Sequence, residues 1–448
     1  MLRLLAILFV ISVFVPVEFY TMAGSVRIEP YRVILGLVLV YALLNFKTVL
    51  ERADLVDILL IGLWLMVFTS IWQNHNMQQA IESSGIYAIE TLGAFYLARL
   101  YITTPERFFQ INRLFVVILA SLTLFAVYEA LAQHRFLHDI AKWMTGHDAL
   151  DFRLYMHYYI RNGIMRATSL FEHPILYGSL LALFFPFAFL WWLRSRSALV
   201  GLSVVGLIVS MITTLSSAPL LSLILQAFST VLAAFWHSAR RLWIALLFGG
   251  IAGAMLINAF SNRGFFGILI AYLTFNPNTG YFRMMQWEQS MDDIAENPIL
   301  GIGLIGPGLH DWTRPYWMDD WFGNSIDSFW LLLTLQHGLF AAFLLLFASL
   351  YATFSILNLS HKHDDETRWM VTAWLLSFLS LILIGFTVDY FGKLQPMFFF
   401  VLGAIAWAKD YDIWNNRQAE ELESGQPVAD TDAEFHNLEI VRKNYYRI

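Results

Sequence analysis

The segregation of charge along the chain most strongly constrains its fold. Only 14% of the 448 residues are charged, whereas about 25% are charged in a typical soluble domain. The charges gather in a few segments, and the stretches between them reach the roughly 20 apolar residues that a helix needs to cross a bilayer. These stretches are continuous and do not alternate as barrel strands do. The sequence therefore predicts an all-α, polytopic membrane protein.

Twelve apolar stretches are candidate spans. They lie at about 3–21, 31–47, 54–72, 80–102, 109–132, 173–193, 198–215, 218–236, 242–259, 327–354, 368–390 and 394–408. Only residues 216–219 separate the seventh from the eighth, so eleven or thirteen spans also fit the sequence. No small-x-small cleavage motif follows the long first run, which we interpret as a retained span rather than a signal peptide.

The short connections between the spans carry most of their positive charge on one side. That side holds Lys47, Arg52, Arg107, Arg113, Arg194, Arg196, Arg240, Arg241, Lys362 and Arg368, and the other side holds Arg27, Arg32 and Lys393. The positive-inside rule puts the first side in the cytoplasm. Both termini are then cytoplasmic, and the two long loops, 133–172 and 260–326, are extracytoplasmic. Residues 1–409 form the transmembrane domain, and the acidic tail 410–448 is predicted to be disordered.

Composition also argues against several kinds of site. The absence of cysteine excludes disulfides and thiolate metal ligands, and no basic block resembles a nucleic-acid footprint. Glu172 and His173 are adjacent, but no further metal ligand is suitably spaced. Asp292 and Asp293 could hold Mg²⁺, but a solvated helix face explains them better. We therefore expect no metal ion and no cofactor.

The second long loop is the candidate active site, because loops of this length are usually functional. Within it, residues Tyr281 to Asn297 predict an amphipathic helix whose apolar stripe contains Met284, Trp287, Met291 and Ile294. Arg283 lies away from that stripe. The helix either lies on the membrane surface or covers a cavity and directs Arg283 at an anion.

Arg166, Arg263 and Arg283 follow or precede predicted spans on this same side. Each of them alone could be an interfacial anchor. Guanidinium groups match phosphate bidentately and keep their charge. Together the three arginines therefore predict a diphosphate site.

Two acidic residues fall in apolar spans, where a charge is costly without a role or a partner. Asp327 opens the span after the second loop, and either Asp327 or His310 could act as a general base. Glu90 lies near the middle of the fourth span. It either contacts substrate or forms a hydrogen bond between packed helices.

Residues Gly301 to Gly306 match the spelling of a GxGxxG motif. A dinucleotide site requires a preceding strand and a following helix, and here a proline precedes the motif and another follows it. We reject dinucleotide binding. A flexible turn that lets the backbone approach a ligand remains plausible.

Three stretches carry a resemblance to a known family. They are Arg166 to Pro174; Arg283 to Trp287 with Asn297 to Gly303; and Asp327 to Leu331 with His337 to Leu339. The second is similar to an R-x-x-x-W and N-P-x-x-G-x-G signature, and the third to an H-N-x-Y-L segment. In this order, they resemble the O-antigen ligase and polysaccharide polymerase superfamily of bacterial inner-membrane proteins.

The chain departs from the family pattern in two places. Asp327 and Ser328 stand where many ligases have His-Asn, and residues 216–219 stand where relatives often have a Ser-Arg pair. The phosphate-binding arginine of that pattern is therefore absent from this turn. Both differences favour an exopolysaccharide-type polymerase over a lipopolysaccharide ligase.

The resemblance implies a GT-C-like membrane glycosyltransferase in the bacterial inner membrane. It would transfer an oligosaccharide from a polyprenyl diphosphate to a sugar hydroxyl of a second lipid-linked unit, without a nucleotide sugar. Chain-length regulators and flippases are the implied partners. The implied catalytic residues are Asp327, His310 and Arg283, and the implied substrate contacts are Arg166, Arg263, Arg283, Glu90, Trp287, Asn324 and Trp317.

Two alternatives stay open at this point. A ligase differs from a polymerase only in its acceptor, which is a different glycolipid. A polysaccharide or lipid transporter would also have about a dozen spans, although no inverted repeat is visible in the sequence.

Overall fold

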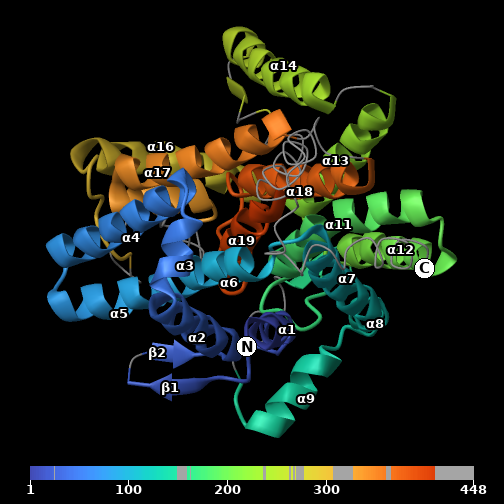
Figure 1. Ribbon diagram of the computed structural model, residues 1–448, viewed down its shortest axis with the longest axis horizontal. Coiled ribbons are helices and arrows are strands. Elements are labelled where there is room, and N and C mark those ends of the chain that lie inside the picture. Colours follow the sequence, from blue (N-terminus) through green and yellow to red (C-terminus); the bar gives the residue numbers. More distant parts are fainter. Residues whose placement is uncertain are drawn as a thin grey trace, which may run out of the picture.

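The computed structural model describes residues 1–408 apart from 25, 149–158, 162, 236–238, 262–263, 266–267, 269–276, 306–325 and 360–364 (Figure 1). The predicted tail therefore lies outside the described residues. Helices dominate the described chain, and two short antiparallel strand pairs accompany them. The strands are β1 (Thr21–Ala23) with β2 (Val26–Ile28), and β3 (Ile160–Arg161) with β4 (Ile164–Met165).

The helices follow the apolar stretches of the sequence. They are α1 (Leu2–Val13), α2 (Pro30–Leu44), α3 (Phe46–Glu51), α4 (Leu55–Asn74), α5 (Met77–Ala88), the π-helical η1 (Ile89–Gly93), α6 (Ala94–Tyr101), α7 (Pro105–Ser121), α8 (Thr123–Ala132), α9 (Phe136–Thr145), α11 (Pro174–Ser195), α12 (Ala198–Thr213), α13 (Ser217–Phe235), α14 (Ala239–Phe260), α16 (Pro277–Glu296), α17 (Phe329–Leu359), α18 (Asp365–Ile384) and α19 (Leu394–Gly403).

Five helical segments of the described chain are long and apolar enough to cross a membrane. They are Leu55–Asn74, Pro105–Ala132, Pro174–Ser195, Phe329–Leu357 and Thr367–Ile384. Shorter apolar helices, such as α1 and α2, lie in further predicted spans. A helical membrane protein is thereby confirmed. The count of twelve spans stays a prediction.

α11 and α18 form the centre of the helical bundle, where most of their residues are buried. α12 and α13 pack on α11, while α4 packs along α17 and α19 along α6. Aromatic rings fill the core, as where Phe115 and Phe184 stack at 4.3 Å. Apolar side chains also point outward, including Leu44 and Leu124, each 80% exposed. An apolar exterior around an apolar core fits a lipid environment.

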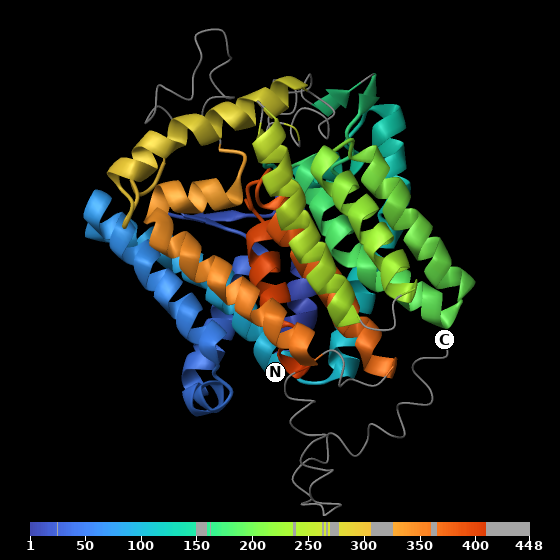
Figure 2. The same cartoon turned by 90° about the horizontal axis from the view of Figure 1, so that it is seen from above.

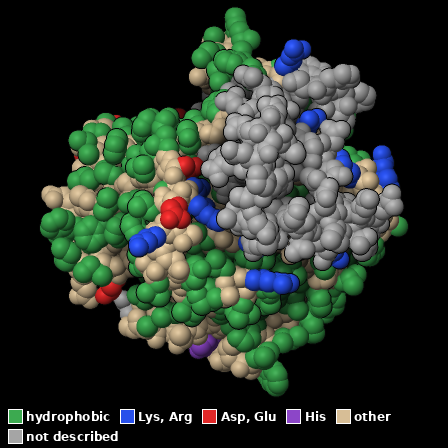
Figure 3. Space-filling model, in the orientation of Figure 1, with side chains coloured by type: hydrophobic (Ala, Val, Ile, Leu, Met, Phe, Trp, Pro, Cys, Tyr) green, Lys and Arg blue, Asp and Glu red, His purple; other side chains and the backbone are tan. Residues whose placement is uncertain are grey.

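The helices define two ends of the bundle. α9, the β3–β4 hairpin and α16 lie at one end, and Met1 lies at the other (Figure 2). We call these the α16 end and the Met1 end. Lysine and arginine side chains stand out on the Met1 end (Figure 3).

α17 is not the continuous span that the sequence predicts. It breaks at Gly338, which has φ 85° and ψ 166°, and its segments 329–337 and 339–359 point in different directions (Figure 2). The carbonyls of Leu335 and Gln336 accept hydrogen bonds from Ile302 and Gly303 N–H, both at 2.9 Å. Within a bilayer such a break persists only where protein groups satisfy the freed backbone.

Two glycines of the sequence Gly301 to Gly306 allow residues 302 and 303 to approach the break in α17. Gly301 and Gly303 have φ of 62° and 79°, a conformation that side chains disfavour. A Cβ on Gly301 would lie 2.4 Å from the Leu335 carbonyl oxygen. The predicted flexible turn is instead a fixed segment docked on the break in α17.

Gly338→Ala is expected to destabilise the protein by about 1–3 kcal/mol or more, because an alanine at this position would have a strained backbone with positive φ. The same Cβ would lie 2.1 Å from the Ile299 carbonyl oxygen. Thermal unfolding followed by tryptophan fluorescence measures the effect. Gly36→Ala is the control, since no atom lies within 4 Å of its Cβ position. Equal melting temperatures for the two variants would contradict the role of the break.

Candidate active site

The α16 end brings together segments that are far apart in the sequence. Ala167 N–H donates to the Thr213 carbonyl at 2.9 Å, which joins the segment after the β3–β4 hairpin to α12. Phe329 N–H donates to the Val388 carbonyl at 3.1 Å, which joins the start of α17 to the loop between α18 and α19. α16 lies across this end and packs on α17 (Figure 2).

Two arginines of the hairpin region are held by the turn between α12 and α13. Arg166, only 5% exposed, donates to the Thr214 carbonyl at 3.2 Å and to Ser216 Oγ at 2.9 Å. Arg161 donates to the Leu215 carbonyl at 2.8 Å. Neither guanidinium forms an ion pair with a carboxylate of the described residues. The turn therefore positions both cations through neutral oxygen atoms and leaves their charge uncompensated.

Arg283 adds a third positive charge from α16. It is buried, and its Nε lies 3.5 Å from Asp327 Oδ2. Burial, together with the charges of Arg161 and Arg283, lowers the pKa of Arg166 to about 9. Burial and Arg283 also lower the pKa of Arg161. These mutual effects identify one group, which we call the arginine cluster. Guanidinium groups stay protonated at neutral pH, so the cluster favours an anion.

The arginine cluster contains two of the three arginines that the sequence analysis named. Arg166 and Arg283 come together as predicted, whereas Arg263 lies outside the described residues. Sequence reasoning missed Arg161. This arginine donates to the Leu215 carbonyl of the α12–α13 turn. Its position in a long polar loop gave no signal of that contact.

Asp327 lies beside a second carboxylate, Asp389, in the loop between α18 and α19. Asp327 N–H donates to Gln286 Oε1 of α16 at 3.0 Å. Burial, followed by the charge of Asp327, raises the pKa of Asp389 to about 7. The sequence prediction placed Asp389 inside a span that ended at 390, but α18 ends at Ile384. A charge near the end of that apolar run was the available signal.

The inward face of α16 is polar. Met284, Trp287, Met291 and Ile294 form the apolar stripe that the sequence predicts. Of these only Ile294 is buried, and Met291 is 46% exposed. The buried side chains are instead mostly polar, namely Phe282, Arg283, Gln286, Ser290 and Ile294. Contacts with Asp327 turn the polar face of α16 inward. This geometry supports a helix that covers a site rather than one that only rests on a membrane surface.

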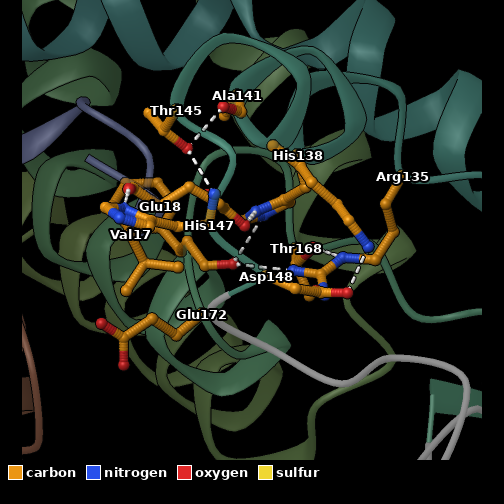
Figure 4. A network of polar contacts seen from close by, with 12 residues as sticks. Val17, Glu18, Arg135, His138, Ala141, Thr145, His147, Asp148, Thr168 and Glu172 are labelled. Atoms are coloured by element: carbon orange, nitrogen blue, oxygen red, sulfur yellow. Dashed lines mark hydrogen bonds and ion pairs between the residues drawn. The ribbon is translucent and has the colours of Figure 1, made fainter. Parts of the chain in front are cut away.

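A buried network fixes the segment that carries Arg166. Glu129 accepts hydrogen bonds from Thr168 N–H at 3.1 Å, Thr168 Oγ1 at 2.7 Å and Ser169 N–H at 2.7 Å. Arg135 donates to Thr168 Oγ1 at 3.1 Å (Figure 4). Ser169 has φ 55°, which this set of contacts holds in place. Glu129 thus fixes the backbone of Thr168 and Ser169, and with it the segment that carries Arg166.

The same network reaches the end of α1. His138 Nδ1 lies 2.8 Å from Glu18 Oε1, and its Nε2 lies 3.1 Å from the Phe171 carbonyl oxygen (Figure 4). All three residues are buried. A hydrogen-bonded imidazole therefore ties the segment after the hairpin to the connection between α1 and β1.

Glu90 lies in the π-helical segment η1 and is buried. It accepts hydrogen bonds from Tyr31 Oη at 2.7 Å and from Arg32 Nε at 2.8 Å. These are the contacts expected of a carboxylate that joins packed helices. A role for Glu90 in substrate binding stays a prediction.

Several predicted site residues lie outside the described part of the chain. They are Arg263, His310, Trp317 and Asn324, together with the neighbouring Trp312 and Trp321. Trp287 is described, and it packs against a small apolar cluster that includes Ile294 and Leu331. Within the described residues, no group of three His, Asp or Glu side chains is arranged to hold a metal ion.

The fold and these contacts define a helical membrane protein with a buried cationic site at one end of its bundle. No protein-family model matches the chain, and no curated protein sequence matches it. The resemblance to O-antigen ligases and polymerases therefore rests on the three sequence motifs.

Glu129→Ala is expected to lower the stability by about 2–3 kcal/mol, since it leaves buried backbone N–H donors of Thr168 and Ser169 without an acceptor. Thermal unfolding measures this loss. Glu51→Ala, at an exposed end of α3, is the matched control and should leave the melting temperature unchanged. A loss no larger than that of the control would show that the network does not fix the segment.

Proposed function

We propose that this protein is a membrane glycosyltransferase that polymerises lipid-linked oligosaccharides. The observation that carries the proposal is the arginine cluster beside the Asp327 and Asp389 carboxylates. Two buried arginines and the half-buried Arg161, with one carboxylate of the described residues within ion-pairing distance, suit a strongly charged anion such as a diphosphate. The nearby carboxylates suit the acceptance of a proton from a sugar hydroxyl.

The distribution of positive charge supports an orientation in a bacterial inner membrane. Arginine and lysine side chains are visible on the Met1 end (Figure 3), and the short connections with most of the positive charge, such as those with Lys47 and Arg52, lie at this end. By the positive-inside rule the proposal puts this end in the cytoplasm and the α16 end outside. The twelve-span count belongs to this proposal, with the shorter apolar helices crossing beside the five long ones.

The arginine cluster would bind the diphosphate of a polyprenyl carrier. Its guanidinium groups match phosphate oxygens in pairs and are fixed in advance by the α12–α13 turn and by α16. When the bond between the anomeric carbon and the phosphate oxygen breaks, negative charge develops on the leaving group. Fixed cations stabilise that charge without rearranging.

The two carboxylates would take different roles in the transfer. Asp327 is paired with Arg283 and helps to orient it. Asp389, with its pKa raised to about 7, is a suitable base at neutral pH. It would remove the proton of the acceptor hydroxyl, whose oxygen attacks the anomeric carbon as the polyprenyl diphosphate departs. This sequence needs no nucleotide sugar, and the donor would reach the site after a flippase has moved it outward.

Arg161→Ala and Arg283→Ala are each expected to reduce transfer by about 100-fold or more, because the leaving group loses a fixed cation. The assay uses protein in lipid nanodiscs with a labelled oligosaccharide on polyprenyl diphosphate, and gels resolve the products. Arg241→Ala is the control, since this arginine is exposed at the opposite end of the bundle. Full activity of Arg283→Ala would remove the basis of the proposal.

Activity is expected to fall about tenfold for each pH unit below about 7, because protonation of Asp389 removes the base. Above that pH the carboxylate is ionised and activity reaches a plateau. Asp389→Asn should lower the rate by about 100-fold or more and abolish this dependence. A variant with the wild-type profile would exclude Asp389 as the base.

The same assay separates the polymerase from its alternatives. A ladder of repeats supports the polymerase. A single transfer that requires a second glycolipid indicates a ligase. Movement of the donor across the membrane without any transfer indicates a transporter.

A further inference from the structure

A cavity of about 140 Å³ lies beside Asp389, between α4, α5, α17 and the start of α19. Its lining combines polar groups with aromatic rings. Its polar side chains include Tyr87, Gln336, His337, Asp389 and Gln395. Polar groups at this depth of an apolar bundle are costly unless they bind something. The proposed transfer uses only Asp389 among them.

Two of these groups present hydrogen-bonding atoms that the described protein does not use. Tyr87 Oη is shielded from solvent and has no hydrogen-bond partner. His337 is held by Ser70, whose Oγ lies 3.2 Å from Nδ1. Ser70 Oγ donates its own proton to the carbonyls of Leu300 or Gln336, at 2.5 Å and 2.8 Å, and so accepts from Nδ1–H. Nε2 of His337 is therefore left as an acceptor.

The lining of the cavity suits the hydroxyl groups and one apolar face of a sugar ring. The Asp389 carboxylate and His337 Nε2 accept hydrogen bonds, Tyr87 Oη donates, and the two glutamine amides do both. Sugar hydroxyls also donate and accept. The rings of Phe329 and Tyr390, stacked at 4.3 Å, give an apolar wall for the C–H face of a sugar.

Asp389 connects this cavity to the arginine cluster. It lines the cavity, its charge interacts with that of Asp327, and Asp327 pairs with Arg283. A sugar ring in the cavity would have one hydroxyl beside Asp389, on the side that faces the bound diphosphate. A donor and an acceptor arranged in this way meet at the two carboxylates.

We infer that the cavity is the acceptor subsite and holds the terminal pyranose ring of the growing or incoming chain. This inference rests on the proposed function. It adds Tyr87, His337 and Gln395 as residues that bind the acceptor and select its sugar. The arginine cluster, by contrast, binds only the donor.

Sugar binding can be measured without any donor. The protein is placed in nanodiscs free of glycoside detergent and titrated with methyl glycosides of glucose, galactose and mannose, and saturation transfer from protein to sugar protons is recorded by NMR. Binding of at least one glycoside is expected, and Arg283→Ala should bind it as the wild type does. Tyr87→Phe and Gln395→Leu should weaken binding about five- to tenfold, which corresponds to one lost hydrogen bond. Gln78→Leu, at an exposed position of α5, is the control.

Tyr87→Phe also distinguishes a ligand-binding role from a structural one. Because Tyr87 Oη has no hydrogen-bond partner among the described residues, its removal should leave the melting temperature unchanged or raise it. In the transfer assay this variant should raise the KM for the acceptor five- to tenfold and leave the KM for the donor unchanged.

The two proposals fail in different ways. Absence of glycoside binding in the wild type, or an unchanged acceptor KM in both Tyr87→Phe and Gln395→Leu, would overturn the acceptor subsite even if a ladder of repeats forms. Glycoside binding without any transfer would instead count against the proposed glycosyltransferase and leave a sugar-binding cavity.

Discussion

Backbone N–H and C=O groups inside an apolar bundle must form hydrogen bonds with other groups of the protein. The α16 end depends on this constraint. The break at Gly338 frees two carbonyls of α17, and the segment 298–304 supplies the N–H groups that they need. Ser70 of α4 and His75, which accepts from Leu304 N–H at 2.8 Å, complete the arrangement. The broken helix, the docked segment and α4 therefore form one rigid support beneath the site.

The same constraint explains how the arginines are held. Arg161 and Arg166 are positioned by carbonyl and hydroxyl oxygens of the α12–α13 turn, which fix a guanidinium without neutralising it. A carboxylate in the same place would have fixed it equally well and cancelled its charge. Orientation and charge are thus supplied by different groups. This separation leaves the cluster able to attract an anion.

Local features of the sequence predicted the helical membrane fold and part of the site. Long apolar runs are visible in any short window, and Arg166, Arg283 and Asp327 flank such runs. Arg161 and Asp389 were missed because their roles depend on contacts with distant segments, namely the α12–α13 turn and the start of α17. The break in α17 was missed because Gly338 is one glycine in an apolar run, and its positive φ follows from the docking of residues 298–304.

The manner in which the first segment of α17 is held has an evolutionary consequence. Its position depends largely on backbone hydrogen bonds to residues 298–304, which most amino acids at the lining positions would preserve. Lining side chains such as Gln336 can therefore change while Asp327 and the helix break stay in place. A lineage that retains Gly301, Gly303 and Gly338 could diversify the small molecule that it accepts through a few substitutions, without having to rebuild its scaffold.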